Sequence, residues 1–238
     1  MTRADVDSVT DEQVFVCGVT AAELARATNA MWRIKDLSYA IVGFLPAFTQ
    51  AEYRSIVRSV FNDWEAVCGI RADETQSTNA NIIISAGRGR RVNFDGPSGV
   101  LAWCELPMPG VNQVRLMMDL DEQWVLSGGG IHVPNVLCHE LGHGLGLDHI
   151  TSAKALMNPT YDRNVPKPLS PDIAQVVSRY GSPRPRVAPV PTPTPEPQPP
   201  STPTTPVPQK PTTPGRTPIT LTVGTQMLYR GYLEDVRP

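Results

Sequence analysis

Three of the chain's four histidines lie within eleven residues of one another, in the stretch HELGHGLGLDH at 139–149. His139 and His143 are four positions apart, so on a helix their rings share one face, with Cβ atoms about 5–6 Å apart and one metal ion within reach. His149 is about 15 Å from His139 along an unbroken helix, so it can reach the same ion only if the chain reverses. Gly146 is the predicted point of reversal, because glycine alone adopts a left-handed backbone cheaply. Three imidazoles leave the fourth tetrahedral position to water, which is typical of a catalytic zinc site.

Glu140 follows the first histidine and can reach a water in that fourth position. Zinc lowers the pKa of such a water to about 7, and a carboxylate can take its proton during attack on a carbonyl and deliver it to a leaving amine. This is the chemistry of peptide-bond hydrolysis. A motif of the H-E-x-x-H type alone arises by chance more often than the longer pattern, whose glycine and third histidine lie at fixed offsets.

The elements that must position these residues are visible in the apolar pattern of residues 32–181. Thr49 and Glu52 form a capping box ahead of a predicted amphipathic helix, TQAEYRSIVRSVFNDWEAVCG. Short strands are predicted at WRIKDLSYAIVGF, NIIISA, GVLAWCEL and VRLMMDL. A second helix is expected to carry the histidines, and a third begins at LSPDIAQVVSRYG with Ser170 as its cap. This order of elements predicts an α+β domain.

Proline marks the boundary of that domain, because 15 of the chain's 25 prolines lie in residues 182–218. Such a segment buries too little apolar area to fold and is predicted to be an extended, disordered spacer. Residues 219–238 alternate like a strand but are too short to fold alone. They are expected to dock or anchor to an unknown partner, with a disordered tail as the alternative. Residues 1–31 form a separate N-terminal segment.

The bulk composition excludes several classes of partner. The net charge is −2, with 21 basic and 23 acidic side chains, so the chain lacks the basic field that nucleic acids or anionic membranes require. No run of about 18 apolar residues predicts a transmembrane helix, and the opening MTRADVDSVTDEQ has no apolar stretch of the signal-peptide type. From the residues alone, the cellular compartment stays open.

Through HELGHGLGLDH and the following ALMNPTY, the sequence resembles the matrixin (matrix metalloproteinase-like) branch of the metzincin zinc endopeptidases, from about Trp32 to Gly181. The resemblance implies a mixed, mostly parallel sheet with an antiparallel edge strand and three helices. It implies that Met157 lies in a tight turn beneath the histidines and that Tyr161 lines the specificity pocket. The backbone of Leu101 and Ala102 would pair with an extended substrate by strand addition. The resemblance also implies an extracellular or surface-associated protein.

The family has two further metal sites, and this sequence matches the ligands of one but not of the other. The resemblance assigns a structural calcium to the carboxylates of Asp95, Asp119 and Glu122, and hard oxygen ligands suit that ion. The positions of the family's second, structural zinc contain residues that form no zinc-binding set, namely Arg88, Arg90, Trp103 and Met117. One zinc per chain is therefore predicted.

Cys17 lies fifteen residues before Trp32, in a CGV stretch similar to the family's inhibitory pro-segment, whose cysteine thiolate occupies the fourth zinc position. Phe15 and Val16 replace the proline and arginine that flank the cysteine in the family. An inhibitory zinc ligand and a cysteine that is free or disulfide-paired are both open at this point. Cys68 and Cys104 are expected to be small buried hydrophobic residues.

The leading hypothesis is a zinc-dependent endopeptidase acting on protein or peptide substrates, with His139, His143 and His149 as ligands and Glu140 as general base. The alternative is a catalytically silent, zinc-stabilised binding or structural module on a surface or particle. An intact Glu140 and an open fourth position favour the enzyme, because a structural role needs neither.

Overall fold

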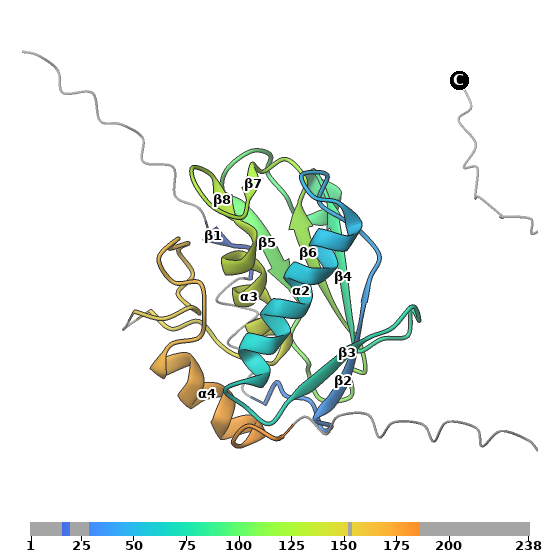
Figure 1. Cartoon of the computed structure of the whole chain (residues 1–238), viewed down its shortest axis with the longest axis vertical. Helices are drawn as coiled ribbons and strands as arrows, with labels where there is room; N and C mark the ends of the chain where they lie inside the picture. The colour runs from blue at the N-terminus through green and yellow to red at the C-terminus, as the bar shows by residue number, and fades with distance from the viewer. Residues whose placement is uncertain (1–15, 20–28, 152–153, 186–238) are drawn as a thin grey trace, which may run out of the picture. The chain divides into compact units, whose positions relative to one another are not determined.

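The computed structural model describes residues 16–19, 29–151 and 154–185, and the account below is confined to them. They form a six-stranded sheet with helices α2 and α3 side by side across one face and α4 near one end of α3 (Figure 1). The helices are α2 (Gln50–Glu65), α3 (Val133–Gly144) and α4 (Ser170–Tyr180). The predicted spacer beyond residue 185, the tail at 219–238 and residues 1–15 lie outside the described residues. No helix among those described is long and apolar enough to cross a membrane.

The sheet has the strand order β1-β5-β6-β4-β2-β3, with parallel pairs except for β5 against β6. Its strands are β1 (Val16–Cys17), β2 (Asp36–Ile41), β3 (Arg71–Glu74), β4 (Ile82–Gly87), β5 (Val100–Cys104) and β6 (Val114–Asp119). The α+β class and the mostly parallel sheet with one antiparallel strand are therefore confirmed. A short pair, β7 (Trp124–Val125) and β8 (Ile131–His132), and a 3-10 turn at Arg90–Val92 complete the elements.

Strand β5 was expected at the edge of the sheet, but here the N-terminal β1 covers that edge. Val16 and Cys17 pair in parallel with Val100 and Ala102. The edge of the domain's own strands therefore already holds an extended segment of peptide, which comes from the same chain.

Helix α2 forms where its capping box predicts. The Thr49 hydroxyl accepts from the Glu52 N–H at 3.2 Å, and the Glu52 carboxylate accepts from the Thr49 N–H at 2.8 Å. The predicted apolar face is buried against the sheet and α3, and the Trp64 indole donates to the Cys138 carbonyl at 3.0 Å. This bond fixes α2 against the histidine-bearing helix.

Tyr180 of α4 and Trp32, which precedes β2, both contact the C-terminal end of α3. The Tyr180 hydroxyl accepts from the Trp32 N–H at 3.0 Å and donates to the Leu145 carbonyl at 2.8 Å. The Trp32 indole donates to the Gly144 carbonyl at 2.8 Å. Contacts continue to Arg184, whose guanidinium pairs with Asp36 at 2.5 Å. Residues distant in sequence thus hold the turn at which the histidine helix ends.

Candidate metal centre

Helix α3 carries His139, Glu140 and His143 through the centre of the domain, with nearly every side chain buried. Two of its glycines permit this. A Cβ at Gly142 would overlap the sulfur of Met157, and one at Gly144 would approach the Cys104 sulfur to 3.1 Å. A helix that is apolar on all sides is stable only when it is buried, and the small residues let its neighbours approach closely.

The chain reverses after α3 as the sequence predicts. Gly146 has a left-handed backbone, with φ of 84°, and a Cβ there would overlap the Ala30 carbonyl. The Gly146 N–H donates to the His143 carbonyl at 2.7 Å, and the Leu147 N–H donates to the Gly142 carbonyl at 2.9 Å. These bonds satisfy the last carbonyls of the helix and turn the chain back towards it.

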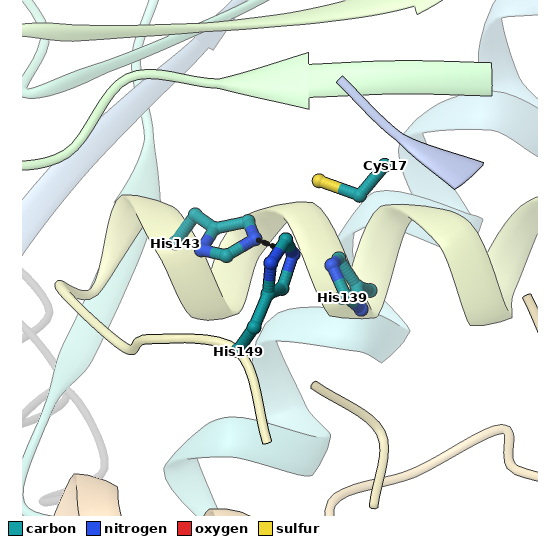
Figure 2. Close-up of side chains that lie close together, drawn as sticks. All are labelled: Cys17, His139, His143 and His149. Atoms are coloured by element: carbon teal, nitrogen blue, oxygen red, sulfur yellow. Dashed lines mark hydrogen bonds between the residues drawn. The ribbon is translucent and has the colours of Figure 1, made fainter. Parts of the chain in front are cut away.

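This reversal brings His149 beside the two helical histidines (Figure 2). The ring centroids lie 4.9 Å apart for His139 and His143, 4.7 Å for His143 and His149, and 5.4 Å for His139 and His149. One potential ligand atom from each histidine and the sulfur of Cys17 all lie within 4.8 Å of one another. The four residues come from β1, α3 and the loop after α3.

Backbone carbonyls orient two of the rings for metal binding. His139 Nδ1 lies 2.7 Å from the Leu156 carbonyl, and His143 Nδ1 lies 2.8 Å from the Leu147 carbonyl. Because a carbonyl only accepts, each Nδ1 must carry the proton and each Nε2 presents a lone pair. His139 Nε2 is buried and has no hydrogen-bond partner in the described part of the chain. An unpartnered buried acceptor is costly unless something else binds it, so the site fits a zinc ion.

The electrostatics also suit a neutral ligand set. Burial lowers the pKa of His139 to about 4 and that of His149 to about 4, and it lowers the pKa of His143 as well. All three imidazoles are therefore neutral at neutral pH, each with one ring nitrogen free of a proton. Metal ligation requires this protonation state.

The Glu140 carboxylate lies within the same buried centre, with only 1% of the residue exposed. Its Oε2 has no hydrogen-bond partner among the described residues. Burial raises the pKa of Glu140 to about 8, partly offset by a hydrogen bond with Cys17. A buried carboxyl group with an unpartnered oxygen, in a pocket that His139 also lines, is suited to exchange a proton with a bound molecule.

Cys17 enters the centre from β1. This segment lies in the cleft between two walls, β5 at Ala102 on one side and the loop at Pro159 on the other. Its N–H donates to the Pro159 carbonyl at 3.1 Å, and the Gly18 N–H donates to the Ala102 carbonyl at 2.8 Å. The sulfur lies over the histidine rings (Figure 2). Burial and the nearby Glu140 raise the pKa of the Cys17 thiol in the absence of metal.

The residues that the resemblance assigned to substrate binding border the centre. Leu101 and Tyr161 line a pocket that also contains His139 and Glu140. The Tyr161 hydroxyl accepts from the His132 N–H at 3.0 Å, which fixes the pocket wall to the start of α3. Ala102 is fully buried and offers its carbonyl to the cleft, where Gly18 now binds it.

Met157 lies beneath α3, and the residue that holds it was missed from the sequence. Asp172 in α4 is fully buried, and its carboxylate accepts from the N–H groups of Leu156 at 2.9 Å, Met157 at 3.0 Å and Leu169 at 2.7 Å. The Leu156 carbonyl in turn binds His139. The sequence signal was an acid in the first turn of a predicted helix, which by itself indicates only capping.

The carboxylates assigned to calcium lie close enough to interact electrostatically, and Asp119 is the last residue of β6. Asp119 is fully buried, and Glu122 accepts from the Ser98 N–H at 2.6 Å, while Asp95 accepts from the Val100 N–H at 3.2 Å. Burial and these neighbouring negative charges raise the pKa of Glu122 to about 7. Among the described residues, only the histidines and Cys17 already lie close enough to hold a metal ion as a group. The calcium site therefore stays a prediction.

The positions without zinc-type ligands make other contacts. Arg88 pairs with Asp121 at 3.3 Å, the Trp103 indole donates to the Val92 carbonyl at 2.8 Å, and the Met117 sulfur accepts from the Ser85 hydroxyl at 3.3 Å. Arg90 lies exposed in the 3-10 turn. Protein contacts thus hold the loop after β4.

Comparison with known proteins places this centre in a family context. The family model described as Matrixin matches residues 31–181. Stromelysin-3 of Rattus norvegicus is 34% identical over 161 residues, which are 66% of this chain and 33% of the relative. Stromelysin-1 of Mus musculus is 33% identical over 159 residues, 64% of this chain and 33% of the relative. Macrophage metalloelastase of Rattus norvegicus is 33% identical over 175 residues, 70% of this chain and 37% of the relative. The chain thus matches only about a third of the length of each of these relatives.

Proposed function

Because the chain belongs to the matrixin family, whose cofactor is zinc, we propose that it is a zinc-dependent endopeptidase. One observation carries the proposal: an oxygen of the buried Glu140 carboxylate has no hydrogen-bond partner in the described part of the chain, and it lies in the same centre as three histidines whose potential ligand atoms are within 4.8 Å of one another. We propose His139, His143 and His149 as the zinc ligands. When bound, zinc supplies Lewis-acid polarisation of water and of a carbonyl group.

Glu140 performs the proton transfers in this proposal. Its carboxylate takes a proton from the attacking water and then delivers it to the leaving amine, so the same group acts first as base and then as acid. Its place inside a dry centre allows it to hold that proton, since burial favours the neutral form. The carbonyls of Leu156 and Leu147 keep the rings of His139 and His143 oriented, and Met157 packs beneath the helix that carries them.

Strand β5 binds the substrate backbone in this proposal. The Ala102 carbonyl already accepts from the Gly18 N–H, and the Pro159 carbonyl on the opposite wall accepts from the Cys17 N–H. An extended substrate would use the same two walls by strand addition, which accepts many sequences because main-chain atoms supply the bonds. A side chain beside the scissile bond would enter the pocket between Leu101 and Tyr161.

We further propose that β1 inhibits the site, with Cys17 as the fourth zinc ligand. The support is that its sulfur lies within 4.8 Å of the histidine nitrogens and that its backbone occupies the substrate walls. A single zinc per chain, a calcium at Asp95, Asp119 and Glu122, and an extracellular or surface location are parts of the same proposal. The alternative is a catalytically silent, zinc-stabilised module, and the following experiment distinguishes it from the enzyme.

The experiment compares the full chain with Cys17→Ala, each loaded with zinc, on a mixed peptide library. We expect cleavage by Cys17→Ala, little by the unmodified chain, and none by either after chelation. Zinc analysis should give one tightly held ion per chain. If Cys17→Ala holds zinc but cleaves no peptide, the chain is a silent module; two tightly held zincs would contradict the single-zinc prediction.

A further inference from the structure

His149 differs from the other two histidines because it lies on a loop. Helix α3 ends at Gly144, and its hydrogen bonds fix the chain only as far as Leu147. The ring of His149 is half-buried, and its Nε2 lies 3.1 Å from His143 Nε2. Something outside α3 must therefore hold the backbone that presents this ring.

That support comes from Gln175 in α4, whose side-chain amide contacts both polar groups of the Asp148 main chain. The Asp148 N–H donates to Gln175 Oε1 at 2.9 Å, and Gln175 Nε2 donates to the Asp148 carbonyl at a longer 3.4 Å. A primary amide that binds the N–H and the carbonyl of one residue holds the two successive peptide units on either side of its Cα, and so fixes the position and orientation of the backbone there. Asp148 immediately precedes His149, so the direction of the ring depends on this contact.

Arg179, one turn further along α4, strengthens the arrangement. Its guanidinium lies 3.4 Å from the Asp148 carboxylate and 3.4 Å from Gln175 Oε1. The side chains of Arg179 and Asp148 are 17% and 39% exposed, so solvent screens this contact only in part. The charge holds the Asp148 side chain and orients the Gln175 amide through the same oxygen that accepts from Asp148.

On the other side of His149, the Ile150 N–H donates to the Met157 carbonyl at 2.9 Å. Met157 is itself held by Asp172, which lies three positions before Gln175 and therefore on the same face of α4. His149 is thus clamped between two backbone anchors, both of which lead to α4.

We propose that Gln175, supported by Arg179, is a positioning residue for the third zinc ligand. The inference rests on the proposed function, because it takes His149 to be a zinc ligand. Residues that orient metal ligands typically change metal affinity about 10–100-fold when removed. Gln175 has this effect through a backbone contact with the neighbouring residue, and it touches neither the metal position nor the substrate walls.

The test uses the full chain with Cys17→Ala in every protein, so that only the histidines bind. Gln175→Met keeps the length and packing of the side chain but removes both hydrogen bonds. Ser178→Ala is the matched control, because Ser178 is exposed on the same helix and its hydroxyl donates to the main-chain carbonyl of Gln175. Zinc affinity is measured by competition with a chelator, and the melting temperature is measured after zinc removal.

We expect Gln175→Met to bind zinc about 10–100-fold more weakly, with a zinc-free melting temperature close to that of Ser178→Ala. Wild-type zinc affinity in Gln175→Met would overturn the inference. If Gln175→Met fails to fold, Gln175→Glu replaces it. This variant keeps the acceptor for the Asp148 N–H and loses the donor to the Asp148 carbonyl, so weaker zinc binding is again expected. Unchanged zinc binding would overturn the proposal. If the Cys17→Ala chain itself binds no zinc, the proposed function has failed instead.

Discussion

The carboxylate of Asp172 accepts a hydrogen bond of 3.0 Å from the backbone N–H of Met157, the residue on which α3 rests at Gly142. The same carboxylate holds the N–H of Leu156, whose carbonyl orients His139. A single buried side chain in α4 therefore fixes both the floor of the candidate metal centre and one of its proposed ligands. The stability of the domain and the geometry of the site depend on the same group.

Replacing Asp172 by Asn should therefore reduce both stability and zinc affinity. The new amide NH2 would face N–H donors, leaving at least one buried donor unsatisfied, for an expected loss of about 2–4 kcal/mol in the free energy of unfolding. Denaturant titration of the zinc-free chain measures this loss. The control is Asp63→Asn, which removes a 2.8 Å ion pair with the exposed Lys167 and should cost under about 1 kcal/mol. Equal losses for the two variants would contradict the role given to Asp172.

The buried histidines should make the zinc-free chain sensitive to acid. The pKa of folded His139 is lowered to about 4, whereas an unfolded histidine has its ordinary pKa of 6.5, so the unfolded state binds more protons between these pH values. The stability contribution is thus complete above about pH 6.5 and is lost as the pH falls towards 4. Unfolding free energies of the wild type and His139→Gln, measured from pH 7.5 to 4.5, should converge or cross as the pH falls. Parallel curves would show that the imidazole is not kept neutral by burial.

Calcium should stabilise the chain more at pH 7.5 than at pH 5. The pKa of Glu122 is raised from 4.5 to about 7, so the folded state retains a proton there, and stability falls as the pH rises through that interval. Bound calcium would offset the repulsion among the ionised carboxylates. At pH 5 more of these groups are protonated and repel one another less, so calcium stabilises the fold less. Melting temperatures with and without calcium at the two pH values measure the effect. Glu122→Gln should lose most of it, and a calcium response equal at both pH values would argue against this site.

Zinc should protect the Cys17 thiol from modification. Cys68, Cys104 and Cys138 are buried, so a water-soluble thiol reagent should find no reactive cysteine among them in the folded chain. If Cys17 binds zinc, it should be unreactive in the zinc-loaded protein and become reactive when a chelator removes the metal. Counting modified thiols with and without chelator, with Cys17→Ala as the blank, measures this. A Cys17 that reacts equally in both states would leave the cysteine free of the metal.

Local patterns explain what could be predicted from the sequence. The spacing of His139 and His143, the reversal at Gly146 and the capping box at Thr49 each depend on a few neighbouring residues, and all are present as expected. The role of Cys17 could be suggested only by resemblance, because nothing in its own neighbourhood indicates that β1 reaches the cleft.

Tertiary contacts explain what could not be predicted. Strand β3 has the polar sequence RADE and forms because it pairs with β2, placing Ala72 beside Leu37. Asp172 and Gln175 look like ordinary helix residues, since their partners in the Met157 turn and at Asp148 lie 15 and 27 positions away. A pattern read along the chain gives no information on such partners.

The most direct test of the account is the rate of peptide hydrolysis by zinc-loaded Cys17→Ala with and without Glu140→Gln. General acid–base groups contribute about 10²–10⁴-fold, so kcat/KM should fall at least about 100-fold in the double variant. Zinc content should be the same in both proteins, because Glu140 is not assigned as a ligand. Equal rates of cleavage with equal zinc content would contradict the central claim that Glu140 carries the proton in a zinc-dependent peptidase.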